Sequence, residues 1–201
     1  MLAVSLLGSF RATWCGEPMD LPGRRLVAEL WIYLLLHRDL PLPIGRLLGA
    51  FWPDIPEPDA RANLRRYLHF LGQALPELPE GEAWYHRDRE HLRWNGRAPL
   101  TVDLDRFERL HADARERLRD GDAMAATGLL EQVAEALGGD LLPDVDTTWL
   151  TPFRERHRSQ LLWCLDVLVR LRTGSGQMAS ALATSEQLMA VIPPAWAARC
   201  P

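Results

Sequence analysis

Hydrophobic and polar positions along the first hundred residues follow two different periods. Short alternating runs around Gly8 and Gly16 predict two or three small strands joined by tight turns. Apolar positions at helical spacing then predict a largely buried helix over "RRLVAELWIYLLLHRD", a short helix over "IGRLLGAFW" and a third helix over residues 59–75. The stretch "AWYHRDREHLRW" predicts a hairpin at residues 84–94 with a tight polar turn. Residues 1–97 therefore have the predicted order β-β-α-α-α-β-β.

The third predicted helix has an apolar side and a basic side. At 100° per residue, Leu64, Leu68 and Leu71 gather on one side, while three arginines and a histidine lie opposite or on the flanks. A turn-linked pair of helices whose second member is basic, followed by an arginine-bearing hairpin, is the plan of a winged helix. Its second helix enters the major groove of DNA. The candidate DNA-binding residues are Arg61, Asn63, Arg65, Arg66 and His69 on the helix, and Arg87, Arg89 and Arg93 on the hairpin.

These basic residues allow two interpretations. We expect Arg65, Arg66 and His69 to face base edges and the other arginines to hold phosphates, because the arginine fork suits both guanine and phosphate. The alternative is an ordinary solvated surface, and at the hairpin tip Asp88 and Glu90 alternate with the arginines, so that the tip would be self-neutralised. The tryptophans interpreted as core residues are Trp52, Trp84 and Trp94.

From Leu100 on, the pattern is helical throughout. Four helices are predicted over "TVDLDRFERLHADARERLR", "DAMAATGLLEQVAEAL", "FRERHRSQLLWCLDVLVRLR" and "MASALATSEQLMAVI". Antiparallel pairs of such helices suggest a tetratricopeptide-like array. The predicted fold class is thus an α+β N-terminal winged helix at residues 1–97, followed by an all-α tetratricopeptide-like helical domain at residues 98–201. The helix predicted over "FRERHRSQLLWCLDVLVRLR" carries a leucine stripe, which is interpreted either as core or as a dimer interface. The stripe comprises Leu161, Leu165, Leu168 and Leu171.

Composition and charge narrow the function classes. The net charge is −4; residues 1–98 hold 12 arginines and 12 acidic residues, and residues 99–201 hold 11 and 15, so the second half carries the whole charge. All 23 basic residues are arginine, which excludes a P-loop and a Schiff-base mechanism, since both need lysine. The histidines and cysteines lack metal-ligand spacing, and no serine sits in a nucleophile elbow. We therefore expect no enzyme, no cofactor and no metal.

The same composition bears on the compartment. The longest strongly apolar run, residues 30–36, is too short to cross a membrane. The N-terminus lacks a basic segment and a cleavage site, so no signal peptide is expected. Three cysteines far apart argue against a disulfide framework and fit a reducing compartment. The expected location is the cytoplasm.

Two long stretches carry a family resemblance. "LLGSF", "GEPMDLPGRRLVAELWIYLLLHRDLPLPIGRLLGAFWPD" and "ARANLRRYLHFLGQAL" resemble the DNA-binding domain of SARP-type bacterial transcriptional activators, whose winged helix is shared with OmpR-like response regulators. "VDLDRFERL" and "GGDLLPDVDTTWLTPFRERHRSQLLWCLDVL" resemble the bacterial transcriptional activator domain (BTAD) that follows it. The likeness covers residues 2–193. It implies a regulator that binds direct repeats in promoter DNA as a homodimer and recruits RNA polymerase.

The chain departs from the family pattern in two places. Where members carry a further basic pair, this chain has Gly72 and Gln73. The segment "VIPPAWAARCP" stands where the family continues with another acidic helix, so the array is expected to be truncated or completed by a partner. The alternative hypothesis is accordingly a protein-interaction scaffold whose degenerate winged helix no longer binds DNA. The neutral charge of the first half and the departure at residues 72–73 favour that alternative.

Overall fold

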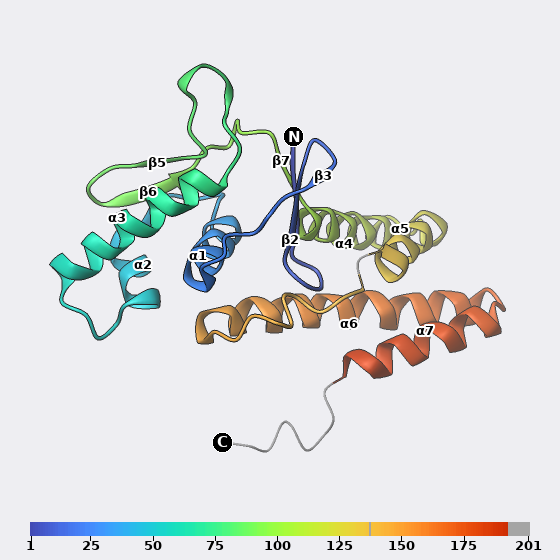
Figure 1. The fold of residues 1–201 in the computed structure, drawn as a ribbon. Coiled ribbons are helices and arrows are strands. Elements are labelled where there is room, and N and C mark those ends of the chain that lie inside the picture. The colour runs from blue at the N-terminus through green and yellow to red at the C-terminus, as the bar shows by residue number, and fades with distance from the viewer. Residues whose placement is uncertain (137, 193–201) are drawn as a thin grey trace. The chain divides into compact units, whose positions relative to one another are not determined.

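The chain folds into two compact units in the computed structural model, which describes residues 1–136 and 138–192 (Figure 1). The first unit comprises residues 1–3 and 11–101, and the second comprises residues 4–10 together with those from 102 on. A four-stranded sheet has the order β3-β2-β1-β7. The chain passes from one unit to the other three times: within β1, between residues 10 and 11, and within β7. The strands are β1 (Leu2–Ser5), β2 (Arg11–Trp14), β3 (Glu17–Pro18) and β7 (Leu100–Val102).

Three helices form the centre of the first unit, as the hydrophobic periodicity predicted. They are α1 (Arg25–Leu36), α2 (Ile44–Phe51) and α3 (Glu57–Ala74). Prolines separate α2 from α3, because Pro53 follows the C-cap of α2 and Pro56 occupies the N-cap of α3. The core between these helices includes the fully buried side chains of Leu30, Trp31 and Leu64. Because the apolar side of α3 packs into this core, the opposite side of α3 faces solvent.

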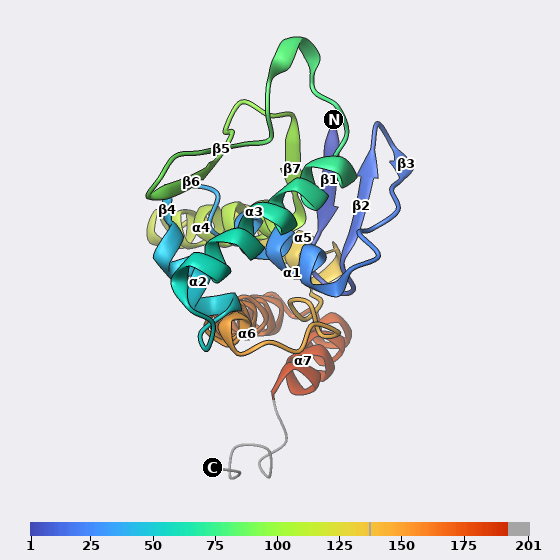
Figure 2. The same cartoon turned by 60° about the vertical axis from the view of Figure 1, so that its left-hand side comes forward.

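The predicted hairpin is present as β5 (Tyr85–Arg87) and β6 (His91–Trp94), which pair in antiparallel register. A two-residue strand that the sequence pattern did not indicate, β4 (Leu42–Pro43), pairs with β6 and gives a second sheet of order β4-β6-β5. A short 3-10 turn (Pro79–Gly81) precedes the hairpin. Trp52, Trp84 and Trp94 are buried, which confirms their assignment to the core. The turned view shows α3 and the hairpin side by side (Figure 2).

The second unit is helical, apart from its N-terminal segment. Its helices are α4 (Asp103–Arg119), α5 (Ala123–Ala136), α6 (Thr151–Gly174) and α7 (Met178–Val191), with a 3-10 turn (Thr148–Leu150) before α6. Successive helices pack on each other as α4 with α5, α5 with α6, and α6 with α7. Leu161, Leu165 and Leu168 are buried within the unit, so this part of the leucine stripe is core. Within residues 1–136 and 138–192, no helix is long and apolar enough to cross a membrane.

Residues 4–10 are held by the second unit through their backbone. The N–H groups of Leu6 and Leu7 donate to the Asp103 carboxylate at 2.8 and 3.1 Å. The N–H of Gly8 donates to the carbonyl of Asp140 at 2.8 Å, and Leu7 forms an isolated antiparallel bridge with Leu141. The sequence pattern did not indicate that a segment this early in the chain would join the helical unit.

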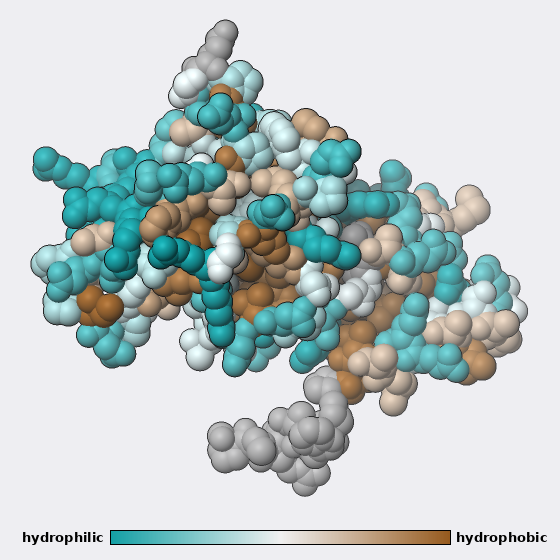
Figure 3. All heavy atoms as spheres, viewed as in Figure 1, coloured by the Kyte–Doolittle hydropathy of each residue, from teal (hydrophilic) through white to brown (hydrophobic). Residues whose placement is uncertain are grey.

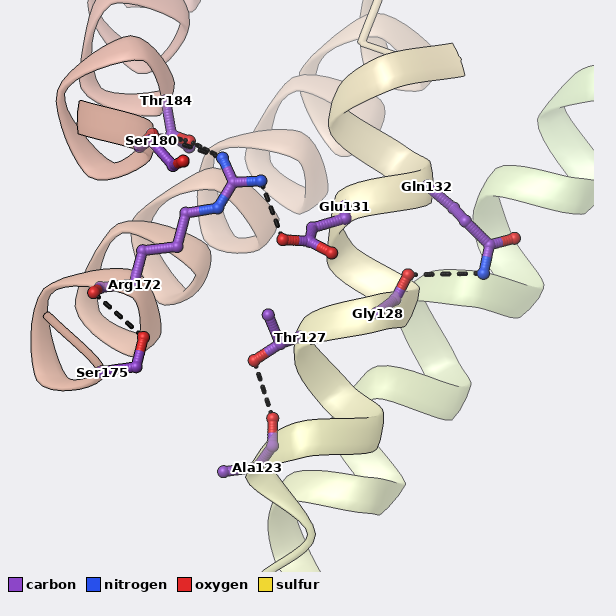
Figure 4. A network of polar contacts seen from close by, with 9 residues as sticks. All are labelled: Ala123, Thr127, Gly128, Glu131, Gln132, Arg172, Ser175, Ser180 and Thr184. Carbon is purple, nitrogen blue, oxygen red and sulfur yellow. Dashed lines mark hydrogen bonds and ion pairs between the residues drawn. The ribbon is translucent and has the colours of Figure 1, made fainter. Parts of the chain in front are cut away.

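A polar network joins three helices of the second unit. The Arg172 guanidinium on α6 donates to the Glu131 carboxylate on α5 at 2.9 Å (Figure 4). The same guanidinium donates to the hydroxyl of Thr184 at 2.5 Å and to the carbonyl of Ser180 at 3.3 Å, both on α7. Because its fork reaches both neighbours, Arg172 fixes α7 against the rest of the helical array.

Candidate DNA-binding surface

The recognition-helix residues lie where the helical wheel predicted. Arg65, Arg66 and His69 are exposed on α3, on the side away from the buried Leu64 and Leu68. Hydrophilic side chains cover the outer side of α3 and the hairpin (Figure 3). The partly exposed flanking residues are Asn63 and Arg61, and the exposed hairpin residues are Arg87, Arg89 and Arg93.

Arg61 joins α3 to the tip of the hairpin. Its guanidinium donates to the Glu57 carboxylate at 2.7 Å, one turn earlier on the helix, and to the backbone carbonyl of Arg89 at 3.1 Å. The salt bridge is exposed and adds little to stability by itself. The bond to Arg89 matters more for the site, because it connects two elements separated by a loop and places the hairpin tip beside the first turns of α3.

Three arginines from α3 and the hairpin share one positive field. The pKa of the Arg87 guanidinium is lowered, first by its partial burial and then by the charges of Arg65 and Arg61. Among the residues that the structure describes, neither Arg65 nor Arg87 forms an ion pair with a carboxylate. Arg61 is paired with Glu57, but the charges of Arg65 and Arg87 favour an anionic ligand such as a phosphate. The cluster of Arg61, Arg65 and Arg87 is called the arginine cluster below.

The other candidate residues have contacts of their own. On α3, the Arg66 guanidinium donates to the Asn63 side-chain oxygen at 2.9 Å and lies 5.4 Å from the ring centroid of Tyr67. His69 has its ring 6.1 Å from that of Phe70. On the hairpin, Arg93 lies close enough to Asp88 to contribute to the lowering of its pKa. All the predicted residues thus lie on α3 or on the hairpin that is bonded to it.

Asp88 stabilises the turn at the hairpin tip through hydrogen bonds to the backbone. Its carboxylate accepts the backbone N–H groups of Glu90 and His91, both at 2.7 Å, and these two bonds are the main reason for its lowered pKa. This Asx-type turn shapes the loop between β5 and β6. His91 lies 4.0 Å from the same carboxylate, so part of the tip is paired internally.

Two further residues contribute to the surface. Tyr85 on β5 donates its hydroxyl to the backbone carbonyl of Leu68 on α3 at 2.6 Å, and burial raises its pKa to about 12. The Arg24 guanidinium, at the start of α1, stacks 4.3 Å from the ring centroid of Phe70 on α3. The available signal for the first was a glycine, Gly72, inside a helical pattern, since such a glycine often has a packing reason.

Metal-ligating groups do not gather in the described part of the chain, where no cluster of three or more histidine, cysteine or acidic residues could hold an ion. Cys164 is buried on α6, and burial raises the pKa of its thiol to about 12. A thiol of that kind is inert as a nucleophile at neutral pH. The candidate site consists of basic and hydrogen-bonding side chains on a helix and a hairpin, which is the arrangement of a winged helix.

Comparison with known proteins agrees with that class. Residues 102–195 match the family model of the bacterial transcriptional activator domain. This domain belongs to regulators of transcription and not to enzymes. This match confirms the resemblance to SARP-type activators over the second unit. It agrees with the expectation that the chain is a regulator rather than an enzyme.

The fold as a whole has a counterpart among solved structures. A structure of Mycobacterium tuberculosis EmbR in complex with a low-affinity phosphopeptide matches with a TM-score of 0.64 at 19% sequence identity. The match covers 93% of this chain and 58% of the EmbR chain, so this chain spans little more than half of that length. No curated protein sequence matches. The predicted fold class, a winged helix followed by a helical tetratricopeptide-like domain, is confirmed.

Proposed function

We propose that this regulator binds double-stranded promoter DNA with α3 in the major groove and the β5–β6 hairpin on the adjacent backbone. The observation that carries the proposal is the arginine cluster, in which Arg65 and Arg87 come from different elements and lack carboxylate partners among the described residues. DNA supplies the missing acceptors, as base edges for Arg65 and as the phosphate backbone for Arg87. Arg65, Arg66 and His69 face base edges, with Asn63 beside them, and Arg87, Arg89 and Arg93 hold phosphates.

The base-reading role is tested with Arg66→Ala. We expect sequence-specific binding to weaken by about 1–3 kcal/mol, because a bidentate contact between arginine and a guanine is lost. Fluorescence anisotropy with a labelled duplex from the upstream region of this protein's own gene measures the affinity, and a scrambled duplex gives the non-specific background. Arg119→Ala, which removes an exposed arginine at the end of α4, is the matched control and should bind as the parent does. Unchanged affinity in Arg66→Ala would show that this side of α3 does not read bases.

Salt dependence separates the main proposal from its alternative. Binding through several phosphates falls steeply as salt rises, with a slope of roughly 0.9 per contact. A chain that binds neither duplex at low salt is instead the interaction scaffold, a hypothesis that the 12 arginines and 12 acidic residues of residues 1–98 favour. In either case the proposed place of action is the cytoplasm.

The helical unit is proposed to form a homodimer and to contact RNA polymerase, so that two copies occupy direct repeats. The outer side of α7 supports a protein contact, since Met178, Leu182 and Met189 are 61%, 65% and 67% exposed and recur at near-helical spacing. Apolar surface is visible over α7 in Figure 3. Glu186 is the one charged residue within Met178–Val191, so few charges oppose the approach of a second copy.

A charge placed on that side of α7 is expected to abolish the dimer. Met189→Glu introduces a carboxylate that would have to be desolvated in an apolar interface, at a cost of several kcal/mol. Sedimentation equilibrium of the parent and the variant measures the change, with Met124→Glu, at a still more exposed position on α5, as the control. A parent chain that is monomeric at tens of micromolar on and off DNA would contradict dimerisation.

A further inference from the structure

We propose that Tyr85 and Arg61 are positioning residues that lock the hairpin onto α3, so that the arginines of both elements meet DNA as one rigid surface. The inference rests on the proposed function, because it assigns to these two side chains the geometry of that same site. It also gives Arg61 a different task from the phosphate contact that the sequence suggested.

Tyr85 ties the start of β5 to the middle of α3. Its hydroxyl donates to the carbonyl of Leu68 at 2.6 Å, although that carbonyl already lies within a regular helix. Its ring lies 6.5 Å from that of Trp94, its partner across the hairpin, and the ring of Trp94 lies 5.9 Å from that of Trp84. The base of the hairpin is thus an aromatic cluster, and the Tyr85 hydroxyl joins this cluster to α3 by a hydrogen bond.

Gly72 provides the space for that contact. A Cβ atom at this position would lie 3.3 Å from the Tyr85 hydroxyl oxygen, which is closer than an ordinary van der Waals contact. Inside a helix, glycine lowers the stability by about 1 kcal/mol relative to alanine. Gly72 is exposed and its φ is ordinary, so neither burial nor backbone strain requires glycine here. The close approach of the tyrosine is the requirement that the structure does show.

Arg61 forms the second tie, near the other end of the hairpin. Its guanidinium donates hydrogen bonds to both the Glu57 carboxylate, at 2.7 Å, and the Arg89 carbonyl, at 3.1 Å. With these donors occupied, Arg61 has less capacity for a phosphate than Arg65 or Arg87 has. Strand β4 pairs with only two residues of the hairpin, His91 and Leu92, so the direction of the hairpin also depends on such anchors. Tyr85 and Arg61 hold it at two separate points along α3.

The salt dependence of DNA binding tests the inference with Tyr85→Phe. This substitution changes no charge, so any change in the salt slope must arise because the hairpin arginines have left the phosphates. We expect the slope of log K against log salt to shrink by about 2, which is roughly two phosphate contacts, and the affinity to fall about tenfold. A slope and an affinity equal to those of the parent would overturn the inference.

Two further variants separate positioning from loss of folding. Gly72→Leu replaces glycine with a good helix former, so α3 is retained while the new side chain displaces Tyr85. It should reproduce the smaller slope of Tyr85→Phe. Tyr67→Phe is the matched control, since the Tyr67 hydroxyl forms no hydrogen bond among the described residues, and it should bind as the parent does. A parental slope in Gly72→Leu would count against the inference.

The failure of the proposed function can be distinguished from the failure of this inference. If the parent binds no duplex, the proposed function is wrong, and positioning is then measured by amide hydrogen exchange. Without its tie, the hairpin opens more often, so the backbone amides of residues 85–94 should exchange about tenfold faster in Tyr85→Phe than in the parent. Equal exchange rates in the two proteins would overturn the positioning role of Tyr85.

Discussion

Phe107→Ala is expected to lower the free energy of unfolding of the second unit by about 3–5 kcal/mol. Phe107 lies on α4 with none of its surface exposed. Its ring is 4.5 Å from that of His157 on α6 and stacks 6.4 Å from that of His111. Truncation to alanine removes this apolar surface and leaves a cavity between two helices that the rest of the unit cannot easily fill.

The neighbouring histidines increase the cost of that cavity. Burial is the main cause of the lowered pKa of both His157 and His111, so each ring is neutral at pH 7. His157 accepts or donates one hydrogen bond, between its Nε2 atom and the carbonyl of Gly139 at 2.9 Å. Phe107 supplies the apolar environment in which two neutral imidazoles are stable.

Urea denaturation followed by near-ultraviolet circular dichroism measures the loss in Phe107→Ala. Trp163 lies 5.1 Å from His111 in the same cluster and reports on the second unit. Met124→Ala removes a side chain that is 86% exposed and should change stability by less than about 0.5 kcal/mol. A loss below about 1 kcal/mol in Phe107→Ala would mean that this cluster does not hold α4 against α6.

Asp103→Ala is expected to destabilise the second unit by about 2–4 kcal/mol, because the backbone N–H groups of Leu6 and Leu7 lose their acceptor. The carboxylate also accepts the N–H of Leu104 at 2.8 Å at the start of α4. Burial raises the pKa of Asp103, while the same backbone hydrogen bonds act in the opposite direction. The residue thus joins a helix start to residues 4–10.

Amide hydrogen exchange provides the specific measurement for Asp103→Ala. The amides of Leu6 and Leu7 should lose protection, in addition to the global loss of stability seen in a urea titration. Asp113→Ala, which removes an exposed carboxylate from the same helix, should leave both quantities unchanged. Retained protection at Leu6 and Leu7 would mean that Asp103 does not hold this segment.

Local periodicity was sufficient to predict most helices and the hairpin. The run of apolar residues over α1 and the prolines around α2 and α3 mark elements whose limits depend on neighbours in sequence. Strand β4 escaped prediction because two residues, Leu42 and Pro43, carry no period, and only pairing with β6 makes them a strand. The assignment of residues 4–10 to the helical unit depends on Asp103 and Asp140, about a hundred residues later.

The candidate site divides in the same way. A helical wheel is enough to place Arg65, Arg66 and His69 on the solvent side of α3, since that follows from the spacing of the leucines. It does not show that Arg87 lies in the field of Arg65, or that Arg61 reaches the carbonyl of Arg89. The DNA-contacting role of all these residues stays a prediction.

The sequence alone was enough to show a resemblance to SARP-type regulators and to predict a winged helix, a helical domain and a basic side on the helix at residues 59–75. Each of these follows from residues within one turn, one hairpin or one motif of each other. Only the tertiary structure decided which partners those residues have. Examples are the close approach of the Tyr85 hydroxyl to Gly72 and the hydrogen bonds from the backbone N–H groups of Leu6 and Leu7 to the Asp103 carboxylate. The physical reason is that hydrogen bonds and close packing between distant segments depend on positions in space. Periodicity along the chain carries no information about those positions.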